Sequence, residues 1–186
     1  MDVFLETERL VLRQFTDADV DLLVDLDRDP AVMRFITGQP TPREEIVDEV
    51  LPAFLSQYER FAGYGFWAAL ERSSGEFLGW LHFRPEEDHP ADEPELGYRL
   101  RQVAWGKGYA TEGARALVTK GFQELGVRRV VASTMAVNIA SRRVMEKAGL
   151  TFVRAFTQPW PYVLEGSEHG DVEYALERAD WERRTS

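Results

Sequence analysis

Residues 105–122 read WGKGYATEGARALVTKGF, in which a lysine stands between two glycines directly before apolar residues at helical spacing. ELGYRL, residues 95–100, is predicted to be a short strand just before this stretch. A strand, a glycine loop and a helix in this order bring backbone N–H groups and the positive end of a helix dipole to one place. Because a side chain there would keep a diphosphate from the amides, the glycines indicate a phosphate-binding loop, with a tight packed turn as the alternative.

Two common nucleotide-binding patterns do not fit this loop. The NTPase pattern needs Gly-Lys-Ser or Gly-Lys-Thr, and here Lys107 is followed by Gly108. The dinucleotide pattern needs glycine or alanine five residues after its first glycine, where this chain has Thr111. The loop is therefore expected to hold a phosphate of a different kind of ligand.

Composition excludes several classes of function. The chain has 186 residues and a formal net charge of −10, with a sequence pI near 4.9, which argues against nucleic acid or an anionic membrane as the partner. It has no cysteine, so disulfides, thiolate zinc sites and cysteine nucleophiles are excluded, and its three scattered histidines predict no metal site. No export signal and no run of ~20 apolar residues is found, and a cytoplasmic location is expected.

The order of predicted elements indicates one domain. Strands are expected at residues 9–15, 65–71, 76–84, 95–100, 128–136, 151–156 and 172–177, with an acidic loop at 85–94. Helices are expected after Thr16, from Thr41 towards Phe61 with Thr41 as the cap and a kink at Pro52, over residues 110–125 and over 138–149. We therefore predict a single α/β (α+β) domain over residues 1–186, with a mixed, mostly antiparallel central sheet flanked by helices.

Several motifs together resemble a known family. WGKGYATEGARAL and NIASRRVMEKAGL occur in this order, together with LETERLVLRQFTDAD near the start and VEYALERADW near the end. The chain thus resembles the GNAT superfamily of acyl-CoA N-acyltransferases over nearly its whole length, and in particular the RimJ/RimL branch, which acetylates protein N-termini. One departure is Val103, where the family favours glutamine or arginine, and Arg101, Gln102 or Lys107 is expected to replace that group.

The resemblance implies acetyl-CoA as the cosubstrate, with its pyrophosphate in the glycine loop. Asn138 would then hydrogen-bond the pantetheine arm, although asparagine is also a favoured helix cap and both roles are compatible. The residues expected to bind acetyl-CoA on this resemblance are Leu100, Arg101, Trp105, Gly106, Lys107, Gly108, Tyr109, Ala110, Asn138 and Ser141.

Acetyl transfer needs a base, because most amines are protonated at neutral pH. Glu95 is the first candidate, since it opens the strand that runs beside the thioester in this family, and the alternative is that it ends a solvated acidic run. His82 is the second candidate, placed by strand alternation on one face with Leu78, Trp80 and Arg84, and the alternative is a packed side chain.

The remaining steps concern the oxyanion and the leaving thiolate. The backbone N–H of Leu100 is expected to stabilise the tetrahedral oxyanion, as the resemblance implies. Many relatives protonate the thiolate with a tyrosine seven residues after the asparagine, but here that position is Met145. Ser141 is the nearest substitute, near a helix N-terminus, and the alternative is a thiolate that leaves unprotonated.

The acceptor amine is less defined. The RimJ/RimL resemblance favours the α-amino group of a protein or peptide, and a small amine such as an antibiotic, a polyamine or an amino acid derivative is the alternative. A non-catalytic acyl-CoA-binding module is a third hypothesis, kept because of Met145, and a homodimer is expected on the resemblance. Aromatic residues in or near the segments that frame the acceptor in this family are Phe35, Tyr58, Trp67, Trp160 and Tyr162, with core packing as the usual alternative.

Overall fold

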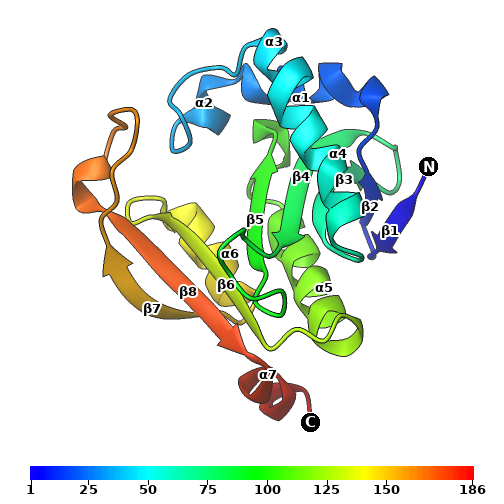
Figure 1. The fold of residues 1–186 in the computed structure, drawn as a ribbon, viewed down its shortest axis with the longest axis vertical. Coiled ribbons are helices and arrows are strands. Elements are labelled where there is room, and N and C mark those ends of the chain that lie inside the picture. The colour runs from blue at the N-terminus through cyan, green and yellow to red at the C-terminus, as the bar shows by residue number, and fades with distance from the viewer. The chain divides into compact units, whose positions relative to one another are not determined.

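The computed structural model describes residues 1–186 and contains one mixed sheet whose strands follow the order β1-β2-β3-β4-β5-β6-β8-β7 (Figure 1). Pairing is parallel between β5 and β6 and antiparallel at the pairs β1–β2, β2–β3, β6–β8 and β7–β8. This confirms the predicted fold class. The strands are β1 (Val3–Glu6), β2 (Leu10–Gln14), β3 (Gly65–Glu71), β4 (Phe77–Arg84), β5 (Glu95–Leu100), β6 (Arg129–Met135), β7 (Thr151–Phe156) and β8 (Asp171–Glu177).

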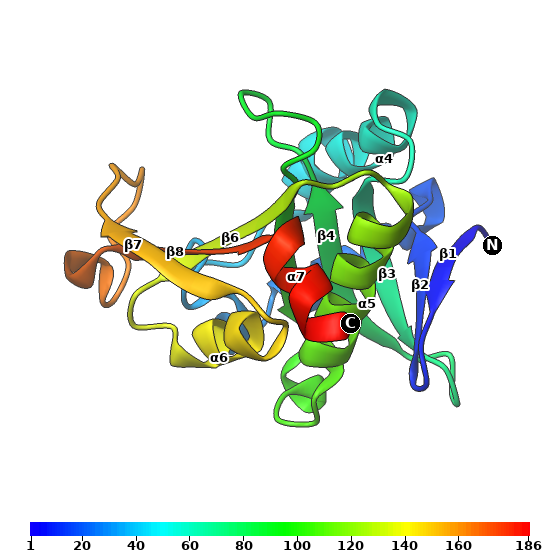
Figure 2. The same ribbon diagram turned by 90° about the horizontal axis from the view of Figure 1, so that it is seen from below.

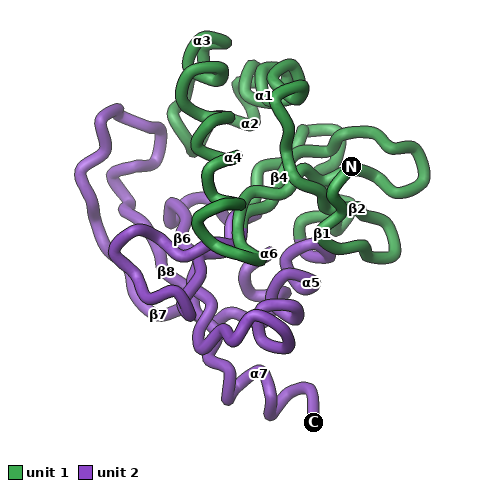
Figure 3. Tube along the Cα trace, turned by 45° about the vertical axis from the view of Figure 1, so that its right-hand side comes forward, with its two compact units in different colours: residues 1–82, 98–110 green, residues 83–97, 111–186 purple.

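Seven α-helical segments accompany the strands, and none of the helices is long and apolar enough to cross a bilayer. The chain divides into two compact units, residues 1–82 with 98–110 and residues 83–97 with 111–186 (Figure 3). The helices are α1 (Val20–Asp27), α2 (Pro30–Met33), α3 (Arg43–Glu45), α4 (Leu51–Arg60), α5 (Tyr109–Glu124), α6 (Ile139–Lys147) and α7 (Arg178–Thr185).

In the first unit, a core of large apolar side chains joins the early helices to strands β3 and β4. Leu23 and Leu26 of α1 and Phe54 of α4 are buried in it, and the Phe54 ring stacks on Phe66 of β3 at a centroid distance of 3.8 Å. Burial of such side chains is the main stabilising contribution in a domain of this size. A smaller cluster of Leu10, Leu78, Leu100, Ala104 and Tyr109 packs around the start of α5.

The predicted alternation along β4 is interrupted. Trp80 packs in the helix-side core, whereas Leu78 belongs to the cluster around Tyr109, so the prediction that these two side chains share a face is wrong. Gly79 lies between them with φ of 137°, and a Cβ there would come within 2.2 Å of the carbonyl oxygen of Arg99. A strand glycine in such close contact marks an irregularity that shifts the side-chain period.

The start of the helical segment near residue 42 also differs from the prediction. Pro42, not Thr41, is the N-cap residue, and it makes no side-chain cap hydrogen bond. The Thr41 hydroxyl instead donates to Asp27 over 2.7 Å. The predicted kink position is Pro52, and the segment Ile46–Val50 just before it forms a π-helical turn. Proline cannot donate a helical hydrogen bond, and such a local change in helix geometry is compatible with that loss.

In the second unit, α6 packs against one side of strands β6, β8 and β7, as Figure 2 shows. Tyr174 of β8 is buried, and its hydroxyl accepts from Arg142 and donates to Glu146, both on α6 and both at 3.1 Å. These bonds fix α6, and with it Asn138 and Ser141, on the sheet.

An ion pair within the first unit links α1 to β5. Asp27 is 3% exposed and accepts from Arg99 Nη1 over 2.8 Å as well as from Thr41. The Arg99 guanidinium lies 4.9 Å from the ring centroid of Trp80. Position 27 lies four residues after buried Leu23, on the apolar face of α1, whereas the other acids of this helix are exposed.

Replacing Asp27 with alanine is expected to lower the free energy of unfolding by about 3 kcal/mol, because it leaves the Arg99 charge buried without its partner. The matched control is Asp25→Ala, whose carboxylate lies 3.3 Å from Arg28 on the exposed side of the same helix. The control should change stability by less than about 1 kcal/mol. Urea unfolding of both variants measures the difference, and equal small losses would contradict the structural role given to Asp27.

Candidate active site

The end of β5 places the proposed oxyanion donor. The N–H of Arg101 donates to the carbonyl of Leu78 on β4 over 2.8 Å. Because successive amides of a strand point to opposite edges, the N–H of Leu100 points away from β4. At that edge the Trp105 indole donates to the Leu100 carbonyl over 2.9 Å, which ties the loop to the strand end.

The glycine loop has the geometry that its sequence predicts. Gly106 and Gly108 have φ of 71° and 83°, in the left-handed region that side chains disfavour. Residues 105–108 are exposed, and α5 begins at Tyr109. A Cβ at Gly106 would meet nothing within 4 Å, so backbone conformation, and not tight packing, requires glycine there. The loop thus presents amides at the N-terminus of a 16-residue helix.

The cations near the loop have different surroundings. Arg101 donates to the Glu76 carboxylate over 2.8 Å and to the Phe77 carbonyl over 3.1 Å, which fastens it to the start of β4. Val103 is 58% exposed in the short turn between β5 and the loop. The Arg101 side chain therefore takes part in an ion pair within the fold. Lys107 is exposed, and it is the better candidate to replace the glutamine or arginine expected at position 103.

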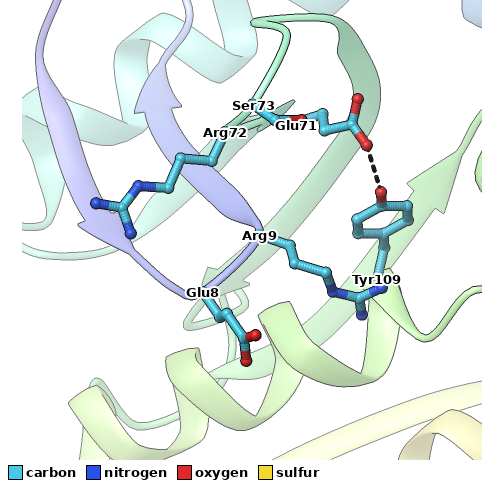
Figure 4. Close-up of a pocket in the computed structure, with 6 residues that line it drawn as sticks. All are labelled: Glu8, Arg9, Glu71, Arg72, Ser73 and Tyr109. Carbon is cyan, nitrogen blue, oxygen red and sulfur yellow. Dashed lines mark hydrogen bonds between the residues drawn. The ribbon is translucent and has the colours of Figure 1, made fainter.

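A pocket of about 350 Å³ lies beside the loop, within the first unit (Figure 4). The Tyr109 hydroxyl donates to Glu71 over 2.6 Å, and this hydrogen bond lowers the pKa of Glu71. The Arg9 guanidinium stands 4.5 Å from the centroid of the Tyr109 ring and donates to the carbonyl of Lys107 over 2.8 Å. The lining residues are Glu8, Arg9, Glu71, Arg72, Ser73 and Tyr109.

In the second unit, Asn138 caps α6. Its side-chain oxygen accepts from the N–H of Ser141 over 3.3 Å, which confirms the cap role; contact with pantetheine stays a prediction. Met145 is 2% exposed and belongs to the core. The position seven residues after Asn138 is thus filled by a packing residue.

Glu95 begins β5 as predicted and pairs with Val131 of β6. The carboxyl group of Glu86 lies close to that of Glu95. The pKa of Glu86 is raised, first by burial and then by the charge of Glu95 and a hydrogen bond with it. His89 Nε2 lies 3.9 Å from Glu86 Oε2. Glu86 and Glu95 are therefore neighbouring carboxyl groups and not separate members of a solvated run, and Glu86 is the one whose pKa is raised.

The other candidates are mostly packed side chains. His82 stacks beside Trp80 at 5.8 Å and meets the edge of Phe66 at 5.2 Å between centroids, which favours the packing role. Trp67 is 2% exposed. Burial raises the pKa of Tyr58 to about 12, and the Tyr58 hydroxyl accepts from the N–H of Phe15 over 2.9 Å. Both Trp67 and Tyr58 are therefore structural.

On the far loop, Trp160 and Tyr162 are each 41% exposed, and the Trp160 indole donates to buried Asp171 over 3.3 Å. Phe35 is half-buried beneath the guanidinium of Arg34. These three aromatic side chains keep accessible surface.

The first unit holds Leu100, Arg101 and the whole loop from Trp105 to Ala110, and the second unit holds Glu95, Asn138 and Ser141. The sequence alone did not identify two residues that lie near the loop, Arg9 and Glu71. Arg9 and Glu71 were each assigned only to a strand. Neither has a local signal, because each meets the loop through contacts across many residues of sequence.

Comparison with known proteins places the chain in a family. A family model described as the acetyltransferase (GNAT) domain matches residues 9–151. FsC-acetyl coenzyme A-N(2)-transacetylase of Aspergillus fumigatus is 36% identical over 186 residues, covering 96% of this chain and 78% of that protein. YkkB of Bacillus subtilis, an uncharacterized protein, is 33% identical, covering 83% of this chain and 91% of that protein.

Solved structures show the same fold. RimL, a ribosomal L7/L12 α-N-protein acetyltransferase in complex with coenzyme A, aligns with a TM-score of 0.76 at 22% identity, over 95% of this chain and 98% of that chain. Aminoglycoside acetyltransferase AAC(6′)-Ib in complex with coenzyme A aligns with a TM-score of 0.75 at 21% identity, over 95% of this chain and 99% of that chain. At such identities the likeness concerns the fold alone.

Replacing Glu86 with glutamine is expected to stabilise the protein at pH 7 and leave stability unchanged at pH 4. A raised pKa means that the folded state disfavours the ionised form, so the group costs stability as pH rises above its ordinary value of 4.5. The gain should be below about 1 kcal/mol, because Glu86 is half-buried and solvent screens its charge.

Urea unfolding at the two pH values measures this effect. Asp88→Asn is the matched control, since Asp88 is an exposed acid of the same loop. A gain at pH 7 that persists undiminished at pH 4 would show that the effect is not due to ionisation of Glu86.

Proposed function

We propose that this chain, which belongs to the GNAT family of acetyltransferases, moves the acetyl group of acetyl-CoA to a primary amine of a small molecule. N-acetyl transfer from acetyl-CoA is the activity of this family. The observation that carries the proposal is the exposed Gly106-Lys107-Gly108 loop at the N-terminus of α5. Its amides, the helix dipole and Lys107 suit a pyrophosphate.

The chemical steps are assigned to residues as follows. Glu95 takes a proton from the acceptor ammonium, and the neutral nitrogen attacks the thioester carbonyl. The N–H of Leu100 donates to the oxyanion that forms. After the attack the nitrogen still carries one extra proton. When the tetrahedral intermediate expels the CoA thiolate, the thiolate either leaves unprotonated while the extra proton passes to solvent, or takes a proton from Ser141, which the proton from the nitrogen then replaces.

The surroundings of Glu95 support it as the base. Its charge helps to raise the pKa of Glu86, so Glu86 is the carboxyl that holds a proton more strongly and Glu95 is the carboxylate beside it. A carboxylate is the form that can take a proton from an ammonium.

The name of one relative favours a small-molecule acceptor. The Aspergillus protein, 36% identical over 96% of this chain, is named for acetyl transfer to an N(2) nitrogen of FsC. The α-amino group of a peptide, to which the motifs of the RimJ/RimL branch point, is the second candidate acceptor. The net charge of −10 suits a cationic amine in either case.

Other parts of the proposal rest on the sequence. We propose that residues 1–186 act as one catalytic domain, in the cytoplasm and as a homodimer, with no nucleic acid or membrane as partner. Sedimentation of the pure protein measures the dimer.

A thiol-release assay with acetyl-CoA tests the acceptor class. The panel contains small primary amines, such as aminoglycosides, polyamines and amino acid derivatives, beside short peptides with varied N-terminal residues. Release with small amines supports the proposal. Release with peptides alone would overturn it in favour of the second candidate.

Replacing Glu95 with glutamine is expected to lower turnover at neutral pH by about 10²-fold or more, the usual contribution of a general base. Affinity for acetyl-CoA should stay within about twofold, because Glu95 is assigned to the amine. Steady-state kinetics at pH 6 to 9 measures both quantities. Unchanged turnover across that range would remove Glu95 from the mechanism, and Asp88→Asn again serves as the control.

Asn138→Ala is expected to raise the KM for acetyl-CoA about fivefold through loss of one hydrogen bond, with little change in turnover. Because alanine also removes the α6 cap, Asn138→Ser provides the matched comparison: serine keeps a cap acceptor but has no amide donor. Equal KM increases in both variants support a pantetheine contact. A normal KM in Asn138→Ser, or a pure loss of turnover, would leave Asn138 with the cap role alone.

A further inference from the structure

We infer that Arg9 is a positioning residue that sets the orientation of the glycine loop for the pyrophosphate of acetyl-CoA. Arg9 lies just before β2, 98 residues from the loop in sequence, and no catalytic or binding role follows from its local sequence. The inference rests on the proposed role of the loop and adds a residue from a different part of the chain to it.

The central contact is a hydrogen bond to the loop backbone. Arg9 Nη1 donates to the carbonyl oxygen of Lys107 over 2.8 Å. The chain has no cis peptide bond, so the carbonyl of Lys107 and the N–H of Gly108 point in opposite directions from the same planar peptide. Holding the carbonyl towards Arg9 therefore aims the Gly108 N–H away from Arg9. The bond fixes the direction of one of the amides at the start of α5.

Arg9 is itself held in place from two sides. Its guanidinium lies 4.5 Å from the centroid of the Tyr109 ring, an arrangement favoured by cation–π attraction. The Tyr109 hydroxyl donates to Glu71, and the backbone carbonyl of Arg9 accepts from the N–H of Arg72 over 2.8 Å. Figure 4 shows the Arg9 side chain extended towards Tyr109, with the Glu71–Tyr109 hydrogen bond next to it.

Glycine at position 108 fits this arrangement. A Cβ there would lie 3.4 Å from Arg9 Nη2, and φ of 83° disfavours any side chain. Two adjacent peptides flanked by left-handed glycines can rotate easily when nothing holds them. A charged donor bound to the carbonyl between the two glycines removes that freedom before the ligand arrives, which lowers the entropic cost of binding.

Arg72 offers a matched comparison. It lines the same pocket and carries the same charge, but its guanidinium contacts the Thr7 carbonyl at 3.2 Å and Glu6 at 3.6 Å. Figure 4 shows the Arg72 side chain directed away from Tyr109. An effect of local charge on a polyanionic ligand should appear in both arginines. An effect of loop orientation should appear in Arg9 alone.

The test measures dissociation constants of CoA and of pantetheine, which lacks the pyrophosphate, by calorimetry with the Arg9→Met and Arg72→Met variants. Methionine keeps an unbranched stem and removes the guanidinium. Arg9→Met should weaken CoA about tenfold and change pantetheine less than twofold, and Arg72→Met should change neither by more than twofold. Thermal unfolding is recorded alongside, and Arg9→Lys, which retains charge, replaces Arg9→Met if that variant fails to fold.

Three results would overturn the role of Arg9: equal weakening of both ligands, equal weakening of CoA in the Arg9 and Arg72 variants, or unchanged CoA binding in the Arg9 variant. A different result separates the two proposals. If the wild-type protein binds CoA no more tightly than pantetheine, the loop does not hold the pyrophosphate, and the proposed role of the loop fails before that of Arg9 is considered.

Discussion

The left-handed backbone at Gly106 and Gly108 is the constraint on which the candidate site depends. It turns the chain from the end of β5 into α5 while the loop stays exposed. Any other residue at these two positions would bear a conformational cost of about 1 kcal/mol or more. Three hydrogen bonds hold this turn in place. The Trp105 indole donates to the Leu100 carbonyl at the end of β5, and the Arg101 side chain donates to the Phe77 carbonyl at the start of β4. The Arg9 side chain donates to the Lys107 carbonyl within the loop.

The net charge of the chain and the charged side chains near the loop have different effects on a ligand. The net charge of −10 repels polyanions at long range and suits a cationic acceptor. Around the loop, however, the charges of Arg9 and Lys107 help to lower the pKa of Glu71, and Arg101 pairs with Glu76 over 2.8 Å. Because salt screens charges beyond about 10 Å, the local cations decide whether a pyrophosphate is attracted to the loop.

Local patterns predicted most elements and failed where a distant contact intervened. The helix after the loop, its end at Gly126 and the strand that starts at Glu95 follow from periodicity and glycine alone. Thr41 was assigned to a cap, but its hydroxyl bonds buried Asp27 of another helix. Leu78 was placed with Trp80, but the close approach of Gly79 to Arg99 breaks the alternation. Propensity describes a residue's own segment, whereas these outcomes depend on a neighbouring one.

The sequence by itself determined the fold class, the family resemblance and the place of the glycine loop, because period, glycine and charge act over a few residues. Only the tertiary structure decided that Glu86 stands beside Glu95, that Met145 is a core residue and that Arg9 reaches the carbonyl of Lys107. The physical reason is that burial and hydrogen-bond partners are properties of the packed chain. A guanidinium 98 residues away from a loop leaves no mark on the sequence around either of them.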